Sequence, residues 1–324
     1  MRKIASFSTL KTELLTGALF LFLLFGCSPK DQKPVVPSDS PYLMVLGIAQ
    51  DAGYPQAGYE AEWQAIKEGK RQSALTVSLG LVDPAHKKRY LFEATPDFKE
   101  QLHLMDQVSE TDNYPFDGIF LTHAHIGHYT GLMHLGREVM GTNSTQVYAM
   151  PKMKVFLEEN GPWSQLVALK NISIKEMRGA ATVRLGSNIS VTPFLVPHRD
   201  EYSETVGYQI SANQKSVIFI PDIDKWEKWN IDIAEVVKEN DIVLIDASFF
   251  KDGELPERDM SKIPHPFTTE SMDLLEKLSP ENKAKVYFIH ANHSNPILDK
   301  TSAAYKEVID RGFNVAEQGQ VFPF

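Results

Sequence analysis

The feature that most constrains this chain is a group of three histidines that follows a short apolar run. Residues 118–121 read Gly-Ile-Phe-Leu, which predicts a buried strand, and His123, His125 and His128 come directly after it. Side chains two positions apart in an extended segment point to the same side, so His123 and His125 can face one point, which His128 can approach about one turn further on. Neutral imidazole is the commonest protein ligand for zinc, and a catalytic zinc site needs three protein ligands and an open position for water. The sequence therefore predicts a metal site.

Composition narrows the class of protein and of partner. A chain of 324 residues with 43% hydrophobic and 23% charged content is long enough for one large or two small folded domains. The net charge is −9, and no block of Lys and Arg reverses it locally, so a nucleic acid is a poor partner and a small molecule is the expected substrate. The single cysteine excludes intramolecular disulfides and cysteine-rich zinc sites.

The amino terminus has the pattern of a secretory signal. A positively charged start precedes a strongly apolar stretch over residues 14–25, and Cys27 follows it. The end of this stretch resembles a bacterial lipobox, which implies cleavage after residues 1–26 and a lipid on the thiol of Cys27. A plain signal peptide or an uncleaved anchor with an incidental cysteine is the alternative. We expect a location in the bacterial cell envelope, facing the periplasm or the exterior.

Residues 27–41 are expected to be a tether, because they contain four prolines and no apolar periodicity. Residues 42–324 are expected to form the folded domain. Strands occur in runs there, with helices between them in both halves, a pattern that fits an α/β fold with two packed sheets covered by helices.

Three later apolar runs also end in side chains that can bind a metal. His198 follows Leu-Val-Pro, Asp222 follows the predicted strand 216–220, and His290 follows the predicted strand 286–289. Asp224 competes with Asp222 for the same role, although the strand end favours Asp222. The order of these groups along the chain is more specific than the histidine cluster alone.

A strand, an H-x-H-x-x-H motif and a Gly-Leu helix start together resemble the first metal motif of the metallo-β-lactamase superfamily. The resemblance implies an αββα four-layer sandwich and a two-metal arrangement. The first ion would be held by His123, His125 and His198; the second by His128, His290 and the carboxylate at position 127; and Asp222 would bridge them. Bound zinc lowers the pKa of water to about 7, which generates hydroxide at neutral pH.

Position 127 departs from the superfamily, because Gly127 stands where an aspartate is usual. The first zinc site is complete, whereas the second lacks one anionic ligand and is expected to bind its ion weakly unless another acid substitutes. Asp51, in the turn-rich loop after the first strand, is the candidate substitute; the alternative is that Asp51 only forms an Asx-turn. His293, close behind His290, also remains open as a ligand.

The segment from the strand 216–220 to His290 resembles transfer-RNA 3′-processing nucleases and the phosphonate-pathway cyclic phosphodiesterase of this superfamily. By that match, Asp246 and His265 would assist proton transfer beside the metal. Their alternative roles are structural, as a loop carboxylate and a helix-start residue. The superfamily resemblance also places Glu93 where a structural aspartate is common.

Most of the mature chain resembles the family of pyrroloquinoline-quinone biosynthesis protein B. The residues that carry the match are Gly-Tyr-Pro-Gln at 53–56, Phe-Ile-His-Ala-Asn at 288–292 and Asn-Pro-Ile-Leu at 295–298. That pathway operates in the cytoplasm, whereas this chain is expected to be exported.

Three functions remain open. The first is a zinc-dependent hydrolase of a small ester, phosphodiester, lactone or amide. The second is an iron-dependent enzyme that uses oxygen, like the quinone-cofactor protein, since imidazole and carboxylate suit both metals. The third is a lipid-anchored binding protein that has lost catalysis.

Overall fold

The computed structural model describes residues 36–37, 39–109, 116–186 and 188–324. The predicted signal segment 1–26, and with it Cys27 and most of the predicted tether, lies outside the described residues. In the described part of the chain, no helix is both long enough and apolar enough to cross a membrane.

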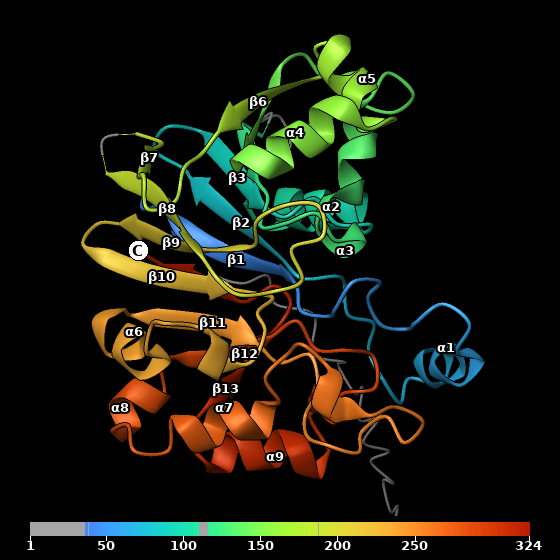
Figure 1. Cartoon of the computed structure of the whole chain (residues 1–324), viewed down its shortest axis with the longest axis vertical. Helices are drawn as coiled ribbons and strands as arrows, with labels where there is room; N and C mark the ends of the chain where they lie inside the picture. The colour runs from blue at the N-terminus through green and yellow to red at the C-terminus, as the bar shows by residue number, and fades with distance from the viewer. Residues whose placement is uncertain (1–35, 38, 110–115, 187) are drawn as a thin grey trace, which may run out of the picture. The chain divides into compact units, whose positions relative to one another are not determined.

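Two seven-stranded mixed sheets form the centre of the fold (Figure 1). The first sheet has the strand order β14-β1-β2-β3-β4-β5-β6, and the second has the order β13-β12-β11-β10-β9-β8-β7. The strands of the first sheet are β1 (Tyr42–Gly47), β2 (Ser78–Asp83), β3 (Lys88–Phe92), β4 (Gly118–Phe120), β5 (Thr145–Ala149), β6 (Ile172–Glu176) and β14 (Val321–Pro323). Those of the second sheet are β7 (Val183–Arg184), β8 (Ile189–Leu195), β9 (Val206–Ala212), β10 (Lys215–Ile220), β11 (Ile242–Asp246), β12 (Val286–Ile289) and β13 (Asn314–Val315).

Helices cover the outer face of each sheet. Helices α2 (Phe98–Ser109), α4 (Pro151–Glu159) and α5 (Trp163–Ala168) pack on the first sheet, and α6 (Ile233–Glu239), α7 (Thr268–Leu274) and α9 (Ala303–Asp310) pack on the second. The shorter helical segments are α1 (Glu60–Lys67), α3 (Ile126–Tyr129), α8 (Pro280–Lys283) and the 3-10 turns Thr130–Leu135, Trp226–Lys228, Met260–Lys262 and Pro296–Leu298. The predicted α/β four-layer sandwich is confirmed.

The apolar run of β1 shows how the sequence specifies the layers. Leu43 and Val45 enter the core between the two sheets, whereas Met44 and Leu46 enter the core between the first sheet and its helices. Because successive side chains of a strand point to opposite faces and both faces are covered here, the strand reads as a continuous hydrophobic run and not as an alternating one.

Two predicted elements differ from the structure. The strand expected from Ser73 begins only at Ser78, because residues 73–77 cross the loops after β1 through isolated bridges. The helix expected from Gly131 begins earlier, at Ile126, and continues as a 3-10 turn. A Cβ at Gly131 would lie 2.2 Å from the carbonyl oxygen of Thr95, so this segment is pressed against the loop after β3.

Candidate metal centre

The candidate ligands lie at one edge of both sheets. Strands β3 and β4 pair in parallel, and so do β10, β11 and β12. Strand β1 has the same direction as β3, and β8 has the same direction as β10, because one antiparallel strand lies between the members of each pair. The carboxyl ends of these strands therefore meet where ligands commonly bind in α/β sheets. The groups that follow them are Asp51 after β1, Glu93 after β3, the three clustered histidines after β4, His198 after β8, Asp222 after β10, Asp246 at the end of β11 and His290 after β12.

The first cluster joins four predicted ligands. Ligand atoms of His123, His125, His198 and Asp222 all lie within 4.8 Å of one another. Oδ2 of Asp222 is 3.1 Å from Nε2 of His198 and 3.3 Å from Nε2 of His123. Burial, together with the neighbouring His128, holds the pKa of His123 well below its usual value, so this imidazole is neutral, as a metal ligand must be. Three imidazole nitrogens and one carboxylate oxygen fit a zinc ion.

In two of these histidines, the ring nitrogen that faces away from Asp222 also has a partner. Oγ1 of Thr122 lies 2.9 Å from Nδ1 of His123, and Oε2 of Glu201 lies 3.0 Å from Nε2 of His125. Partners of this kind fix the ring orientation and the tautomer of a metal-binding histidine. His123 is therefore set to offer Nε2, and His125 to offer Nδ1.

A second cluster joins Asp51, His128 and His290. Oδ1 of Asp51 is 3.7 Å from Nε2 of His128, and Oδ2 of Asp222 is 3.8 Å from the same atom. Nε2 of His128 and Nε2 of His290 are both buried and have no hydrogen-bond partner among the described residues. Buried polar atoms are rarely left unpaired, so these two nitrogens point to a missing ligand between them.

Glu93 lies behind His128. Its side chain is fully buried, its backbone φ is +79°, and its Oε1 is 3.6 Å from Nδ1 of His128. Burial opposes protonation of His128, but Glu93, Asp222 and Asp51 together raise its pKa to about 9. A divalent cation entering here would displace that proton.

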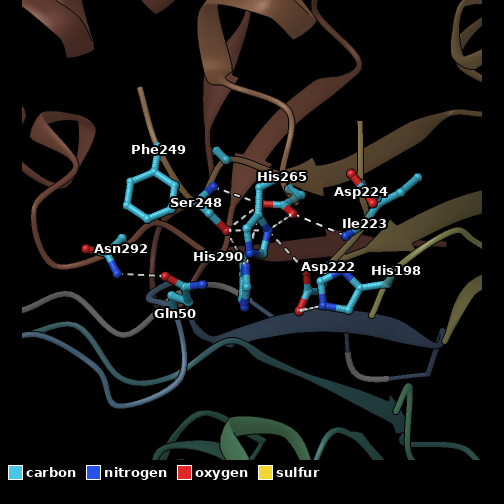
Figure 2. A network of polar contacts seen from close by, with 12 residues as sticks. Gln50, His198, Asp222, Ile223, Asp224, Ser248, Phe249, His265, His290 and Asn292 are labelled. Carbon is cyan, nitrogen blue, oxygen red and sulfur yellow. Dashed lines mark hydrogen bonds and ion pairs between the residues drawn. The ribbon is translucent and has the colours of Figure 1, made fainter. Parts of the chain in front are cut away.

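A buried acid–base group lies on the second-sheet side of Asp222 (Figure 2). Nδ1 of His265 is 2.8 Å from Oδ2 of Asp246 and 3.1 Å from Oδ1 of Asp222. Burial lowers the pKa of His265, but the two carboxylates outweigh this effect and raise it to about 10. Burial raises the pKa of Asp246, but His265 and His290 outweigh this effect and lower it to about 2.

Ser248 is a member of this group that the sequence-based prediction did not identify. Its hydroxyl lies 2.7 Å from Oδ1 of Asp246 and 3.0 Å from Nδ1 of His290, and so connects the two residues. The only signal in the sequence is its position two residues after Asp246, at the end of an apolar run.

Two candidates from the sequence lie elsewhere. Oδ2 of Asp224 accepts a hydrogen bond from Nζ of Lys228 at 2.7 Å, so Asp222 is the carboxylate that joins the histidines. His293 contacts Oε1 of Glu62 at 2.7 Å and belongs to none of the three candidate metal-binding groups found among the described residues, of which the third joins Asp222, Asp246, His265 and His290.

Comparison with known proteins agrees with this geometry. The profile of the "Beta-lactamase superfamily domain" matches residues 88–291. Coenzyme PQQ synthesis protein B of Gluconobacter oxydans is 26% identical over 307 residues, which cover 86% of this chain and 97% of that protein.

Solved structures show the same fold. The Zn(2+)-bound PqqB from Methylobacterium extorquens has a TM-score of 0.72 at 20% identity and covers 87% of this chain and 100% of its own. A diphosphatase from the PhnP family has a TM-score of 0.60 at 21% identity, covering 88% of this chain and 97% of its own. Together, the profile match and the double-sheet fold show that this chain belongs to the metallo-β-lactamase superfamily, among the proteins that resemble PqqB.

Proposed function

We propose that this chain is a zinc-dependent hydrolase of a small ester, phosphodiester, lactone or amide, with phosphodiesters the first class to test. The observation that carries the proposal is the position of Asp222, which belongs to the first cluster, lies 3.8 Å from Nε2 of His128 in the second, and has the pair of Asp246 and His265 beside it. The likeness to a diphosphatase and to a zinc-bound protein supports the substrate class and the metal.

The residues of the first cluster would hold one ion, and His128, His290 and Asp222 would contribute to a second. When bound, such ions supply an acidified water as the nucleophile and neutralise charge on the reacting oxygens. The buried position of Asp222 keeps its carboxylate between the two groups of imidazoles, where His198 and His265 lower its pKa well below the usual value despite the opposing effect of burial.

His265 is the residue best suited to move a proton. Its Nδ1 lies between Asp246 and Asp222, so a proton on this imidazole is held beside the candidate metal centre, from which it would pass to the leaving oxygen as the scissile bond breaks. A pKa of about 10 keeps the imidazole protonated before that step, as a general acid requires.

A substrate would find an adjacent hollow on the first-sheet side. A surface hollow of about 440 Å³ is lined by Phe156, Tyr202 and Glu201, and the last of these contacts His125. Its lining also includes Lys152 and Glu159, and the apolar and aromatic part of it suits a small substrate with an apolar or aromatic portion.

An iron-dependent enzyme that uses oxygen is the second candidate function, because imidazole and carboxylate ligands suit iron as well as zinc. Identifying the metal in the purified protein and measuring dioxygen uptake separates the two. The complete donor set of the first cluster argues against a binding protein without catalysis, because nothing in simple binding requires four converging metal ligands.

The proposed hydrolase is tested on the soluble fragment that begins at Ser28, loaded with zinc and offered chromogenic phosphodiesters, esters, lactones and β-lactams. We expect His123→Ala and His198→Ala each to lower kcat/KM by at least about 100-fold, because each removes a metal ligand. His103→Ala, an exposed histidine on α2, is the matched control and should leave turnover unchanged. Full turnover in either site variant would remove that residue from the site.

A further inference from the structure

The second cluster contains the carboxylate of Asp51, which comes from a loop that supplies no metal ligand in the superfamily resemblance. We propose that Asp51 is the anionic ligand of a second metal ion, together with His128 and His290, and that it replaces the aspartate usual at position 127. The inference rests on the metal dependence of the proposed function and specifies how this chain holds its second ion.

The space around Gly127 shows why the ligand comes from another segment. A Cβ built on Gly127 would lie 2.5 Å from Cα of Asp51 and 2.6 Å from its Oδ1. No side chain fits there, since the first atom of an aspartate at 127 would collide with the backbone of residue 51. The carboxylate of Asp51 thus lies beside the place where a side chain at position 127 would begin.

The loop that carries Asp51 is fastened to the strand end that carries His290. The backbone N–H of Gln50 donates to the carbonyl oxygen of Ala291 at 2.9 Å, and Nδ2 of Asn292 donates to Oε1 of Gln50 at 2.7 Å (Figure 2). Asp51 itself has a positive φ of 37°, a conformation that non-glycine residues seldom adopt. Aspartate tolerates this conformation better than most residues, and the two contacts of Gln50 hold the loop against the segment that carries His290.

An Asx-turn does not account for this carboxylate. Among the described residues, no backbone N–H donates a hydrogen bond to the side chain of Asp51. Its contact is instead with Nε2 of His128, at 3.7 Å. Two ligand atoms that share one zinc ion tetrahedrally are about 3.4 Å apart, so a small movement suffices for both to bind the same ion.

The histidine nitrogens supply the independent evidence for a ligand. Nε2 of His128 and Nε2 of His290 lie in fully buried side chains and have no hydrogen-bond partner among the described residues. A ligand nitrogen of each ring and a carboxylate oxygen of Asp51 lie within 4.8 Å of one another. Their opposite nitrogens face Glu93 and Ser248. Both rings are therefore oriented to present Nε2 to the same place.

The charges also balance. Two neutral imidazoles leave the charge of a divalent cation unneutralised, and Asp51 would reduce that charge, together with the Asp222 carboxylate that the second ion shares with the first. The side chain of Asp51 is 54% exposed, whereas the ligands of the first cluster are largely buried. The second ion is consequently the more exchangeable of the two.

The experiment measures binding of Zn²⁺ and of Co²⁺ to the chelator-treated full chain in detergent, by calorimetry and elemental analysis. We expect two ions per wild-type chain and one per chain for Asp51→Ala, with Asp51→Asn weakening the second ion by at least about 10-fold. Glu60→Gln removes an exposed carboxylate on the nearby helix α1 and should retain both ions. Two equally tight ions in Asp51→Ala, or only one in the wild type, would overturn the proposal.

Gly127→Asp tests the steric argument separately. If Asp51 occupies the space, the new carboxylate should displace the loop, lower the melting temperature and weaken the second ion. Tighter binding of the second ion in Gly127→Asp would show that the space is free and would refute the replacement. Because metal content is measured and not turnover, loss of the second ion in Asp51→Ala would stand even if every substrate of the panel proved inert.

Discussion

Nδ1 of His265 lies 2.8 Å from Oδ2 of Asp246, and both side chains are buried at the edge of the second sheet. This pair is placed to hold and deliver a proton beside Asp222, which the imidazole also contacts at 3.1 Å. Because we assign proton transfer to this pair and metal binding to other residues, the two roles can be tested by different measurements.

We expect Asp246→Asn to lower kcat by about 10²–10⁴-fold, the usual contribution of a positioned general acid or base. The amide cannot stabilise a protonated His265, so the alkaline limb of the pH–rate profile should shift to lower pH. Steady-state kinetics between pH 5 and 10 check this. A profile that keeps its wild-type alkaline limb would assign Asp246 a purely structural role.

The raised pKa of His265 has a consequence for stability. The pKa is about 10 in the folded chain against an ordinary value of 6.5, so its stabilisation is fully present below pH 6.5 and is lost as pH rises through about 10. After chelation, wild-type protein should therefore lose more free energy of unfolding between pH 6.5 and 10 than His265→Gln does. Urea unfolding at several pH values measures this, and parallel curves would contradict it.

Glu93→Gln should weaken the second ion by about 10–100-fold and leave the first unchanged, because Glu93 orients only His128. Glu254→Gln, which alters another mostly buried carboxylate, serves as the control. Competition with a metal-sensitive dye measures each affinity. Equal losses at both sites would point to general misfolding.

Glu201→Ala should weaken binding of the first ion by about 10-fold, because Glu201 contacts Nε2 of His125 and so fixes the orientation of that ring. The effect should lie at the lower end of the range for such partners, because Glu201 is half exposed. The Zn²⁺ affinity of the first site, measured with the second site removed by Asp51→Ala, tests this. An unchanged affinity would show that His125 needs no partner for its orientation.

Cys27→Ser should release the protein from the membrane fraction, since it removes the thiol to which a lipid would be attached. Fractionation of cells that express the full chain, with labelling by a fatty-acid analogue, gives the measurement. Continued membrane association and continued labelling would refute the predicted lipoprotein processing.

The sequence predicted the fold class and the converging ligands because both depend on local patterns. A buried strand followed by a metal-binding side chain identifies His198, Asp222 and His290. Strands β1 to β12 were placed within a few residues, whereas β13 and β14 were not predicted. The choice of Asp222 over Asp224 also followed from the strand end.

Other features depend on contacts between distant segments. Nothing near Gly127 in the sequence indicates that Asp51 lies against it, and nothing near Ser248 indicates its contact with His290. Helices α1, none of whose residues is buried, and α9 were not predicted from the sequence.

The first cluster draws His123 from one sheet and His198 and Asp222 from the other. An ion bound there would cross-link the two sheets, in addition to the apolar packing and the hydrogen bonds that already join them at this edge, such as the one from the Ala124 N–H to Oγ of Ser203. Ion uptake and folding then form a single equilibrium. The amount of folded protein in the cell would thus depend on the availability of the metal ion, and a shortage of that ion would reduce the abundance of the protein as well as its activity.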